Sequence, residues 1–321
     1  MGILSKLKEN LRLKDEVEKT LIVDGKYLAY RKFNIFHRIL HVFIFVTVAY
    51  QILTGFPLKY SDASWAKPLY YLMGGTFGAM TIHRVYGLIM FLTFLVTVFY
   101  CTLLIILNTD RIKKIGVFDA LPMLPRLKDA IDIYHQVTYY LGIRKAPPDF
   151  DEFIWIDKFD FFAVGWGMFA IGVTGFILWF PEFFTHYLHF PNWAISVAYL
   201  AHTDEAFVAL GWLGLVHLYF AHFGPSKFPM DWVWLTGTFN EVELMEEKPR
   251  LYRKIIKKLG EECPEFLEKY PFLKERYEFI KSIEKLPVEE QILKIIHKAH
   301  EIERQINKEL YERRREVECQ N

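Results

Sequence analysis

The chain has 321 residues, of which 52% are hydrophobic, 17% aromatic and 24% charged, and its formal net charge is +1. A nucleic-acid-binding protein would carry a strong basic excess, so that class is excluded. The three cysteines form no CxxC or CxxCH motif, which excludes an iron–sulfur site, a zinc ribbon and covalently attached haem within this chain. Apolar and charged residues are strongly segregated along the chain, which excludes a soluble, disulfide-stapled or disordered protein.

The apolar residues gather in four stretches, each long enough for the roughly 20 residues that a helix needs to cross a bilayer. Turn formers follow the third and fourth stretches, Pro181 after the third and Gly224-Pro225 after the fourth. We therefore predict an all-α integral membrane protein with a four-helix transmembrane bundle at residues 36–223. Its predicted spans cover about residues 36–58, 82–107, 159–180 and 197–223.

The remaining segments are polar. Residues 1–35 precede the first span, and Asn108–Asp157 is too polar to cross the membrane. Residues 224–321 form a charged tail, in which an apolar pattern including Ile255, Ile256 and Leu259 predicts amphipathic helices. We expect these helices to be interrupted at prolines 264, 271 and 287 and to serve as a docking tail without chemistry of their own.

Lysine and arginine are distributed unevenly between the predicted loops. They are frequent before the first span and between the second and third spans, whereas the loop from Pro181 to Ala201 contains none. Cytoplasmic loops of membrane proteins carry the excess of Lys and Arg. The sequence therefore predicts that both termini face the cytoplasm and that the protein lies in the inner (cytoplasmic) membrane.

Histidines cluster at the ends of three predicted spans, and ionisable side chains inside a membrane indicate function by default. On the fourth span, His202 and His217 are 15 residues apart, which on an α-helix means about 22 Å of rise and about 60° of rotation. They would face the same way at opposite depths, as two haems in one bundle require. His222 would face away from His202, which favours His217 as the inner ligand.

Antiparallel spans then predict which histidines meet. His41 of the first span would meet His217 on the cytoplasmic side, and His83 of the second span would meet His202 on the outer side. Two imidazoles leave a haem iron low-spin and without an open position, so such centres pass electrons. His37 shares a helix face with His41 and stays an alternative ligand, although His41 lies deeper.

A quinone would need groups that donate hydrogen bonds and exchange protons beside a haem. We expect such a site at the cytoplasmic end. Its predicted contacts, to quinone or to haem propionates, are His37, His222, Lys158 and Asp160. At the outer end, Asp204 and Glu205 remain as an alternative proton path or as partner contacts.

Several motifs resemble the di-haem cytochrome b subunits of respiratory formate dehydrogenases and nickel–iron hydrogenases. They include Arg38-Ile-Leu-His41 with Thr54-Gly55, His83-Arg84, Asp157-Lys158-Phe-Asp160 with Trp166-Gly167, Thr174-Gly175, and the run from His202 through Glu205 to His217 and His222. The fourth-helix run looks closest to the formate dehydrogenase gamma branch.

The resemblance implies four transmembrane helices and two haem b groups, with ligands matching His41, His83, His202 and His217. It also implies menaquinone or ubiquinone, and iron–sulfur or catalytic subunits of a dehydrogenase or hydrogenase as partners. The chain itself would catalyse nothing beyond quinone redox chemistry. The long tail after Glu246 departs from the shortest family members, so a quinol-oxidising cytochrome b that feeds a multihaem c-type cytochrome is an alternative.

Two other classes of protein agree with the sequence less well than an electron-transfer protein. A transporter or proton channel would use membrane histidines, but carriers usually show inverted repeats and broken helices, which this sequence lacks. An intramembrane zinc enzyme is disfavoured because no HExxH motif is present and the histidine pairs would lie at different depths.

Overall fold

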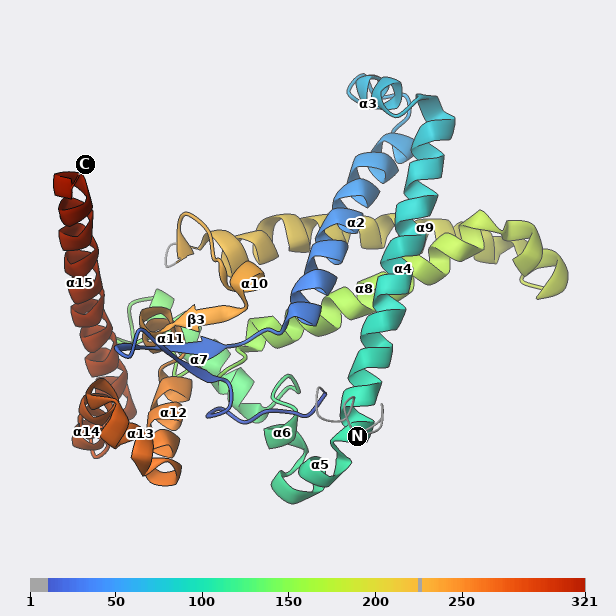
Figure 1. Ribbon diagram of the computed structural model, residues 1–321. Helices are drawn as coiled ribbons and strands as arrows, with labels where there is room; N and C mark the ends of the chain where they lie inside the picture. Colours follow the sequence, from blue (N-terminus) through green and yellow to red (C-terminus); the bar gives the residue numbers. More distant parts are fainter. Residues whose placement is uncertain (1–10, 225–226, 321) are drawn as a thin grey trace, which may run out of the picture. The chain divides into compact units, whose positions relative to one another are not determined.

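The computed structural model describes residues 11–224 and 227–320, with side chains described to residue 312. The chain divides into two compact units (Figure 1). The first includes Asn34–Leu107 and Phe159–Leu235, and we call it the membrane unit. The second includes Arg12–Phe33, Asn108–Lys158 and the residues from Thr236 onward, and we call it the polar unit.

Four long apolar helices confirm the predicted membrane fold. They are α2 (Ile35–Lys59), α4 (Gly75–Leu107), α8 (Trp155–Trp179), and α9 (Asn192–Gly211) continued by the π-helix η2 (Trp212–Phe223). Within the most apolar window of each helix, only 6–17% of the residues are buried inside the protein. The remaining apolar surface is left for lipid, so the chain is a multi-pass membrane protein.

Three helices begin earlier than hydropathy indicated, the third at Trp155 rather than near residue 159. The second starts at Gly75 rather than near residue 82, and the fourth starts at Asn192 rather than near residue 197. Pro191, with extended backbone, directly precedes the fourth helix. Hydropathy detects the apolar stretch that lipid requires, whereas backbone hydrogen bonding sets where a helix ends. The short helices α3 (Ala66–Leu72), η1 (Phe183–Tyr187) and α10 (Val233–Thr236) complete this unit.

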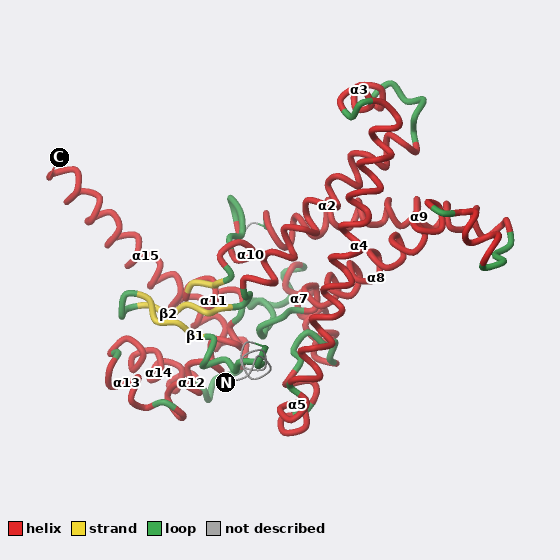
Figure 2. The backbone as a smooth tube through the Cα atoms, turned by 45° about the vertical axis from the view of Figure 1, so that its right-hand side comes forward, coloured by secondary structure: helices red, strands yellow, loops and turns green. Residues whose placement is uncertain are grey.

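Close helix packing in the membrane unit depends on small residues. Helix α2 packs along α4 (Figure 2). Helix α8 approaches α4 at Gly172, where any Cβ would clash with the Phe91 ring, and approaches α9 at Gly167, where a Cβ would lie 2.9 Å from Glu205 Oε1. Small residues let membrane helices come this close.

The polar unit contains a three-stranded antiparallel sheet that the sequence did not predict. Its strands, in the order β1-β2-β3, are β1 (Thr20–Val23), β2 (Tyr27–Arg31) and β3 (Thr238–Asn240). Residues 24–26 join the first two strands, and Asp24 and Gly25 among them have positive φ (52° and 67°), as is common in short hairpin turns. Pairing of β3 with β2 brings a C-terminal segment beside residues 27–31.

Helices form the rest of this unit. They are α5 (Thr109–Ile115), α6 (Val117–Ala120), α7 (Leu127–Tyr140), α11 (Glu241–Glu247), α12 (Pro249–Glu262), α13 (Pro264–Lys269), α14 (Pro271–Ile283) and α15 (Val288–Gln320). Prolines 264 and 271 begin helices, and Pro287 directly precedes α15, as predicted. The residues Ile255, Ile256 and Leu259 of the predicted pattern are at most 4% exposed. The C-terminal region is therefore helical and supplies a core.

A buried ionic group holds this core together. The Glu241 carboxylate, in a residue only 2% exposed, accepts hydrogen bonds from Arg276 Nε (2.8 Å), Tyr252 Oη (3.1 Å) and the Leu28 backbone N–H (3.2 Å). One carboxylate thus connects β2, α11, α12 and α14. A buried charge is tolerated because its hydrogen-bonding capacity is filled.

A second acidic residue ties the N-terminal part of the polar unit to α12. Burial opposes ionisation of Glu16, but hydrogen bonds from the Lys254 and Lys258 ammonium groups outweigh that effect, so the pKa of Glu16 falls from 4.5 to about 2. The N–O distances are 2.5 Å for Lys254 and 2.6 Å for Lys258. Residues 12–33 therefore fold with the C-terminal region, in the unit that also includes Asn108–Lys158.

Candidate functional site

Three histidines converge in the membrane unit, and we call them the inner cluster, after the depth predicted from the sequence. His41 comes from α2, and His217 and His222 come from η2. Their ring centroids are 6.3 Å (His41–His217), 5.7 Å (His41–His222) and 5.3 Å (His217–His222) apart. One ring nitrogen of each lies within 4.8 Å of the other two. Trp234 packs against both His41 and His222.

The π-helix explains why His222 joins this cluster. Its predicted direction assumed α-helical rotation, but Trp212–Phe223 is a π-helix. Hydrogen bonds from residue i to i+5 wind the backbone more loosely, so that residues five apart lie on one face. His217 and His222 are five apart and therefore stand side by side. The rotation argument that set His222 aside does not hold in this segment.

An acidic side chain orients His217. Asp160 Oδ2 lies 2.9 Å from His217 Nδ1, while Asp160 Oδ1 accepts a 2.5 Å hydrogen bond from Trp212 Nε1. The Nε2 atom of His217 is then the ring nitrogen available to a metal. The Nδ1 atom of His41 is buried without a hydrogen-bond partner among the described residues. Such an unpaired polar atom is costly, and a metal bound to it would remove that cost.

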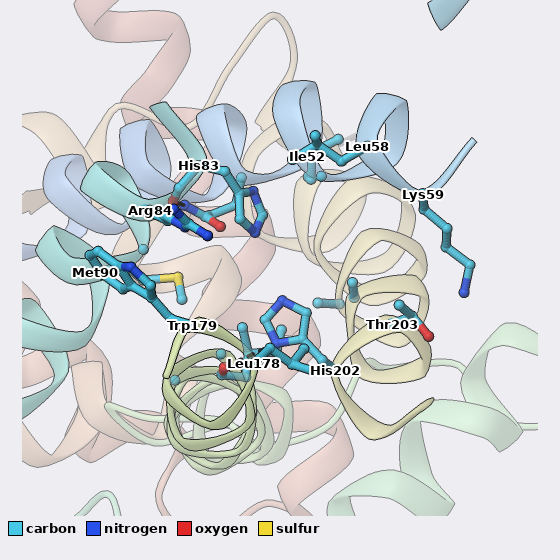
Figure 3. Close-up of a pocket in the computed structure, with 18 of the residues that line it drawn as sticks. Ile52, Leu58, Lys59, His83, Arg84, Met90, Leu178, Trp179, His202 and Thr203 are labelled. Carbon is cyan, nitrogen blue, oxygen red and sulfur yellow. Dashed lines mark hydrogen bonds between the residues drawn. The ribbon is translucent and has the colours of Figure 1, made fainter. Parts of the chain in front are cut away.

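His83 of α4 and His202 of α9 form the second group, the outer pair, with ring centroids 6.1 Å apart. Figure 3 shows both rings projecting into one space between the helices. Thr54 Oγ1 lies 2.9 Å from His83 Nδ1, and Thr174 Oγ1 lies 3.1 Å from His202 Nδ1. Each Nδ1 therefore has a neutral partner. Metal-binding histidines typically show such a hydrogen bond at their other ring nitrogen.

A glycine follows each of these threonines and leaves room for the same imidazole. A Cβ at Gly55 would lie 3.0 Å from His83 Cε1, and a Cβ at Gly175 would lie 3.3 Å from His202 Cε1. The Thr-Gly pair thus occurs twice, on α2 and on α8. In each case the threonine forms a hydrogen bond with the imidazole, and the glycine leaves space for the ring. The repeated dipeptide in two apolar spans was the sequence signal for this arrangement.

The outer pair borders a cavity of about 430 Å³ lined by α2, α4, α8 and α9. This volume falls within the roughly 300–1,000 Å³ typical of small-molecule sites. Its lining is predominantly apolar, with two cations: Arg84 stacks over Trp179 at 5.5 Å, and Lys59 lies 5.3 Å from the Phe207 ring centroid. Figure 3 places Arg84 and Lys59 on opposite sides of the cavity. These cations could bind the carboxylates of a cofactor.

Both histidine groups fit a metal held between two imidazoles. With metal–nitrogen bonds of about 2.0–2.1 Å and a ring radius of about 1.2 Å, opposed rings have centroids about 6.4 Å apart. The observed separations are 6.3 Å for His41–His217 and 6.1 Å for His83–His202. An apolar cavity with two cations at the outer pair matches a flat, apolar group with carboxylates. The residues present therefore fit haem.

The other predicted contacts lie as follows. His37 is exposed and packs edge-on against Tyr100 of α4, with centroids 5.4 Å apart. Lys158 Nζ pairs with Asp129 at 2.8 Å, within the polar unit. Asp204 is exposed, whereas Glu205 lies against Gly167 of α8. Of the four predicted inner contacts, His222 thus belongs to the inner cluster and Asp160 adjoins it.

Comparison with known proteins agrees with this geometry. The family model described as prokaryotic cytochrome b561 matches residues 32–227, which include every histidine of the inner cluster and the outer pair. A comparison with curated proteins finds no match. The matched family includes cytochrome b subunits of hydrogenases and formate dehydrogenases, and it implies haem b. The chain belongs to the prokaryotic cytochrome b561 family and is a membrane electron-transfer subunit.

Proposed function

We propose that this protein carries electrons across the membrane between quinone and a partner redox subunit through two haem b groups. The observation that carries this proposal is the presence of two histidine pairs with ring separations of 6.3 and 6.1 Å, each of which would hold a metal between two imidazoles. In this proposal His41 and His217 hold one haem, and His83 and His202 hold the other. A haem iron with two imidazole ligands has no open position and exchanges single electrons.

The protein's own residues hold and orient the ligands. Hydrogen bonds between Nδ1 and Thr54, Thr174 or Asp160 select the ring orientation of His83, His202 and His217, respectively. Within the inner cluster, His217 is the better ligand because Asp160 occupies its Nδ1 and leaves Nε2 for iron. His41 is preferred to His37 because His41 faces the cluster while His37 packs on Tyr100.

The third histidine of the cluster supports a quinone site at the inner end. His222 is buried, 8% exposed, and its ring lies 5.7 Å from that of His41. A neutral imidazole can donate a hydrogen bond to a quinone oxygen and relay a proton. We therefore assign His222, with His37 at the span end, as contacts for menaquinone or ubiquinone on the cytoplasmic side. Asp160 and Lys158 already have partners, which favours orienting roles for them.

The partner in this proposal is an iron–sulfur or catalytic subunit of a dehydrogenase or hydrogenase, because the family includes cytochromes b of such complexes. Partner and quinone would meet opposite ends of the four-helix unit. A multihaem c-type cytochrome is the alternative partner, with electrons then leaving quinol. Identification of the chains that co-purify from native membranes distinguishes the two.

Haem content of the purified full-length protein tests the ligands. The wild type should contain two haems per chain, and His83→Ala and His202→Ala should each lose the same one. His41→Ala and His217→Ala should each lose the other. The matched control is His186→Ala, at an exposed histidine of η1, which should retain both haems. Two haems remaining in His83→Ala or His202→Ala would refute the outer assignment.

Quinone-linked turnover of variants that retain both haems tests the quinone site. His222→Gln should slow reduction or oxidation of a soluble quinone analogue at least tenfold, because the imidazole donor and proton relay are lost. Unchanged rates in His222→Gln and His37→Gln would remove both residues from the site. Loss of quinone reactivity in Glu205→Gln instead would move the site to the outer end.

A further inference from the structure

The two histidine groups differ in the charge of the groups behind them. His217 Nδ1 contacts the carboxylate of Asp160 at 2.9 Å. His83 Nδ1 contacts a hydroxyl, and His202 Nδ1 contacts the Thr174 hydroxyl and the Ile171 carbonyl, both at 3.1 Å. Among the hydrogen bonds of the described residues, only the inner cluster thus has an anion behind a proposed ligand.

The Asp160 carboxylate is held firmly in place. Its side chain is 14% exposed, and its second oxygen accepts the indole N–H of Trp212 at 2.5 Å. Trp212 lies at the start of η2, five residues before His217. Asp160 therefore receives two N–H donors through its two oxygens, and its orientation toward His217 is fixed by the same helix that carries the histidine.

A carboxylate behind an imidazole makes that imidazole a more basic ligand. A more basic ligand favours ferric iron over ferrous iron, and a nearby negative charge in a poorly solvated site does the same. Both effects are weaker when the partner of the imidazole is a neutral hydroxyl or carbonyl group. At the outer pair, the cations Arg84 and Lys59 line the cavity and favour the more negative, ferrous form.

We propose that Asp160 is a positioning residue that lowers the reduction potential of the haem held by His217 and makes it the lower-potential haem of the two. This inference rests on the proposed function, because it takes His217 as an iron ligand. The cations near the inner cluster have partners of their own and are the same in every variant compared below. Lys227 pairs with Asp231 at 2.8 Å, and the Arg38 guanidinium donates to the Leu235 carbonyl at 2.5 Å.

Redox titration of the full-length protein with both haems bound tests this proposal. Asp160→Asn removes the charge and leaves one carbonyl oxygen for two N–H donors. It should raise the electron affinity of one haem at least tenfold, which is 59 mV for a one-electron couple. The ferric low-spin electron paramagnetic resonance signal of that haem should shift as well, and the signal of the other haem should not.

Two matched variants separate charge from geometry. Trp212→Phe retains the charge but removes the indole donor, so its shift should be smaller than that of Asp160→Asn. The double variant Trp212→Phe/Asp160→Asn lets the amide oxygen accept from His217 alone, and it should retain the raised potential. Thr54→Val should move only the other haem, by less than tenfold in electron affinity.

The outcomes distinguish failure of this inference from failure of the proposed function. A wild type without two haems, or a His217→Ala variant that retains both, would refute the ligand assignment itself. If the ligands are correct but Asp160→Asn shifts neither potential by more than threefold in electron affinity, the role of Asp160 is refuted.

If the Asp160→Asn variant loses the haem held by His217, the His217→Ala variant still tests which haem has the lower potential. The haem that remains in this variant should titrate at the higher of the two wild-type potentials. A remaining haem at the lower potential would overturn the proposal.

Discussion

Gly55→Ala is the sharpest test of how the outer pair is built. An alanine Cβ at this position would lie 3.0 Å from His83 Cε1, whereas carbon atoms in contact keep about 3.5–4.0 Å between them. The imidazole would have to move by a few tenths of an ångström. Thr54, the residue before Gly55, holds this ring through a 2.9 Å hydrogen bond between its Oγ1 and His83 Nδ1. The ring therefore cannot retreat without stretching that hydrogen bond.

Forcing one extra carbon into a packed site typically costs about 1–3 kcal/mol. If that cost falls on the cofactor-bound state, the affinity of the outer site for haem falls about 5- to 150-fold. Gly175→Ala creates the milder contact of 3.3 Å with His202 Cε1, so its effect should lie at the lower end of that range. The expected order of haem retention is wild type, then Gly175→Ala, then Gly55→Ala.

The assay is the rate at which haem passes from the purified protein to an excess of a haem scavenger, followed in reduced-minus-oxidised difference spectra. Gly165→Ala is the matched control because it lies in the same helix as Gly175 and its Cβ would meet nothing within 4 Å. Its haem-loss rate should equal that of the wild type. Equal rates for Gly55→Ala and Gly165→Ala would refute the packing argument, as would a larger effect of Gly175→Ala than of Gly55→Ala.

Three further predictions concern topology and the polar unit. In a background with the native cysteines replaced by serine, a cysteine at Asn192 should react with a membrane-impermeant thiol reagent in intact cells and one at Asn307 should not; the reverse pattern would invert the predicted orientation. Arg276→Met leaves the buried Glu241 carboxylate without its cation and should destabilise the polar unit by about 3–5 kcal/mol in thermal unfolding, whereas adding Glu241→Gln should recover part of that loss. The pKa of Glu16 is lowered from 4.5 to about 2 in the folded protein, so its ionised form contributes stability above about pH 4.5 that is lost as the pH falls toward 2. After solvent screening of its partly exposed lysine partners, that contribution should be about 1 kcal/mol. Glu16→Gln should remove this part of the pH dependence, and an unchanged acid-unfolding profile would contradict the assignment.

Part of the candidate site was predictable because membrane helices obey simple constraints. A span needs about 20 apolar residues, so the four helices follow from hydropathy alone. Antiparallel helices of this length also limit which ends can meet. The sequence accordingly predicted two pairs, His41 with His217 and His83 with His202. In the structure the ring centroids are 6.3 Å apart in the first pair and 6.1 Å apart in the second. Their role as iron ligands stays a prediction.

The direction of His222 was not predictable from the same reasoning. Apolar periodicity assumes a helix type, and no residue pattern in Trp212–Phe223 distinguishes a π-helix from an α-helix. Likewise, strands β1 to β3 are short, and β3 pairs with a partner about 210 residues earlier in the chain. Strand pairing over such a distance depends on tertiary contacts rather than on local preference.

The sequence by itself therefore determined the membrane class, the four spans and which histidines come together, because hydrophobic length and spacing are local properties. Only the tertiary structure decided which groups stand behind those histidines. Thr54 meets His83, Thr174 meets His202 and Asp160 meets His217 across different helices. Such contacts depend on how two helices are rotated against each other, and that rotation is set by packing at glycines such as 55 and 175, which local sequence does not encode.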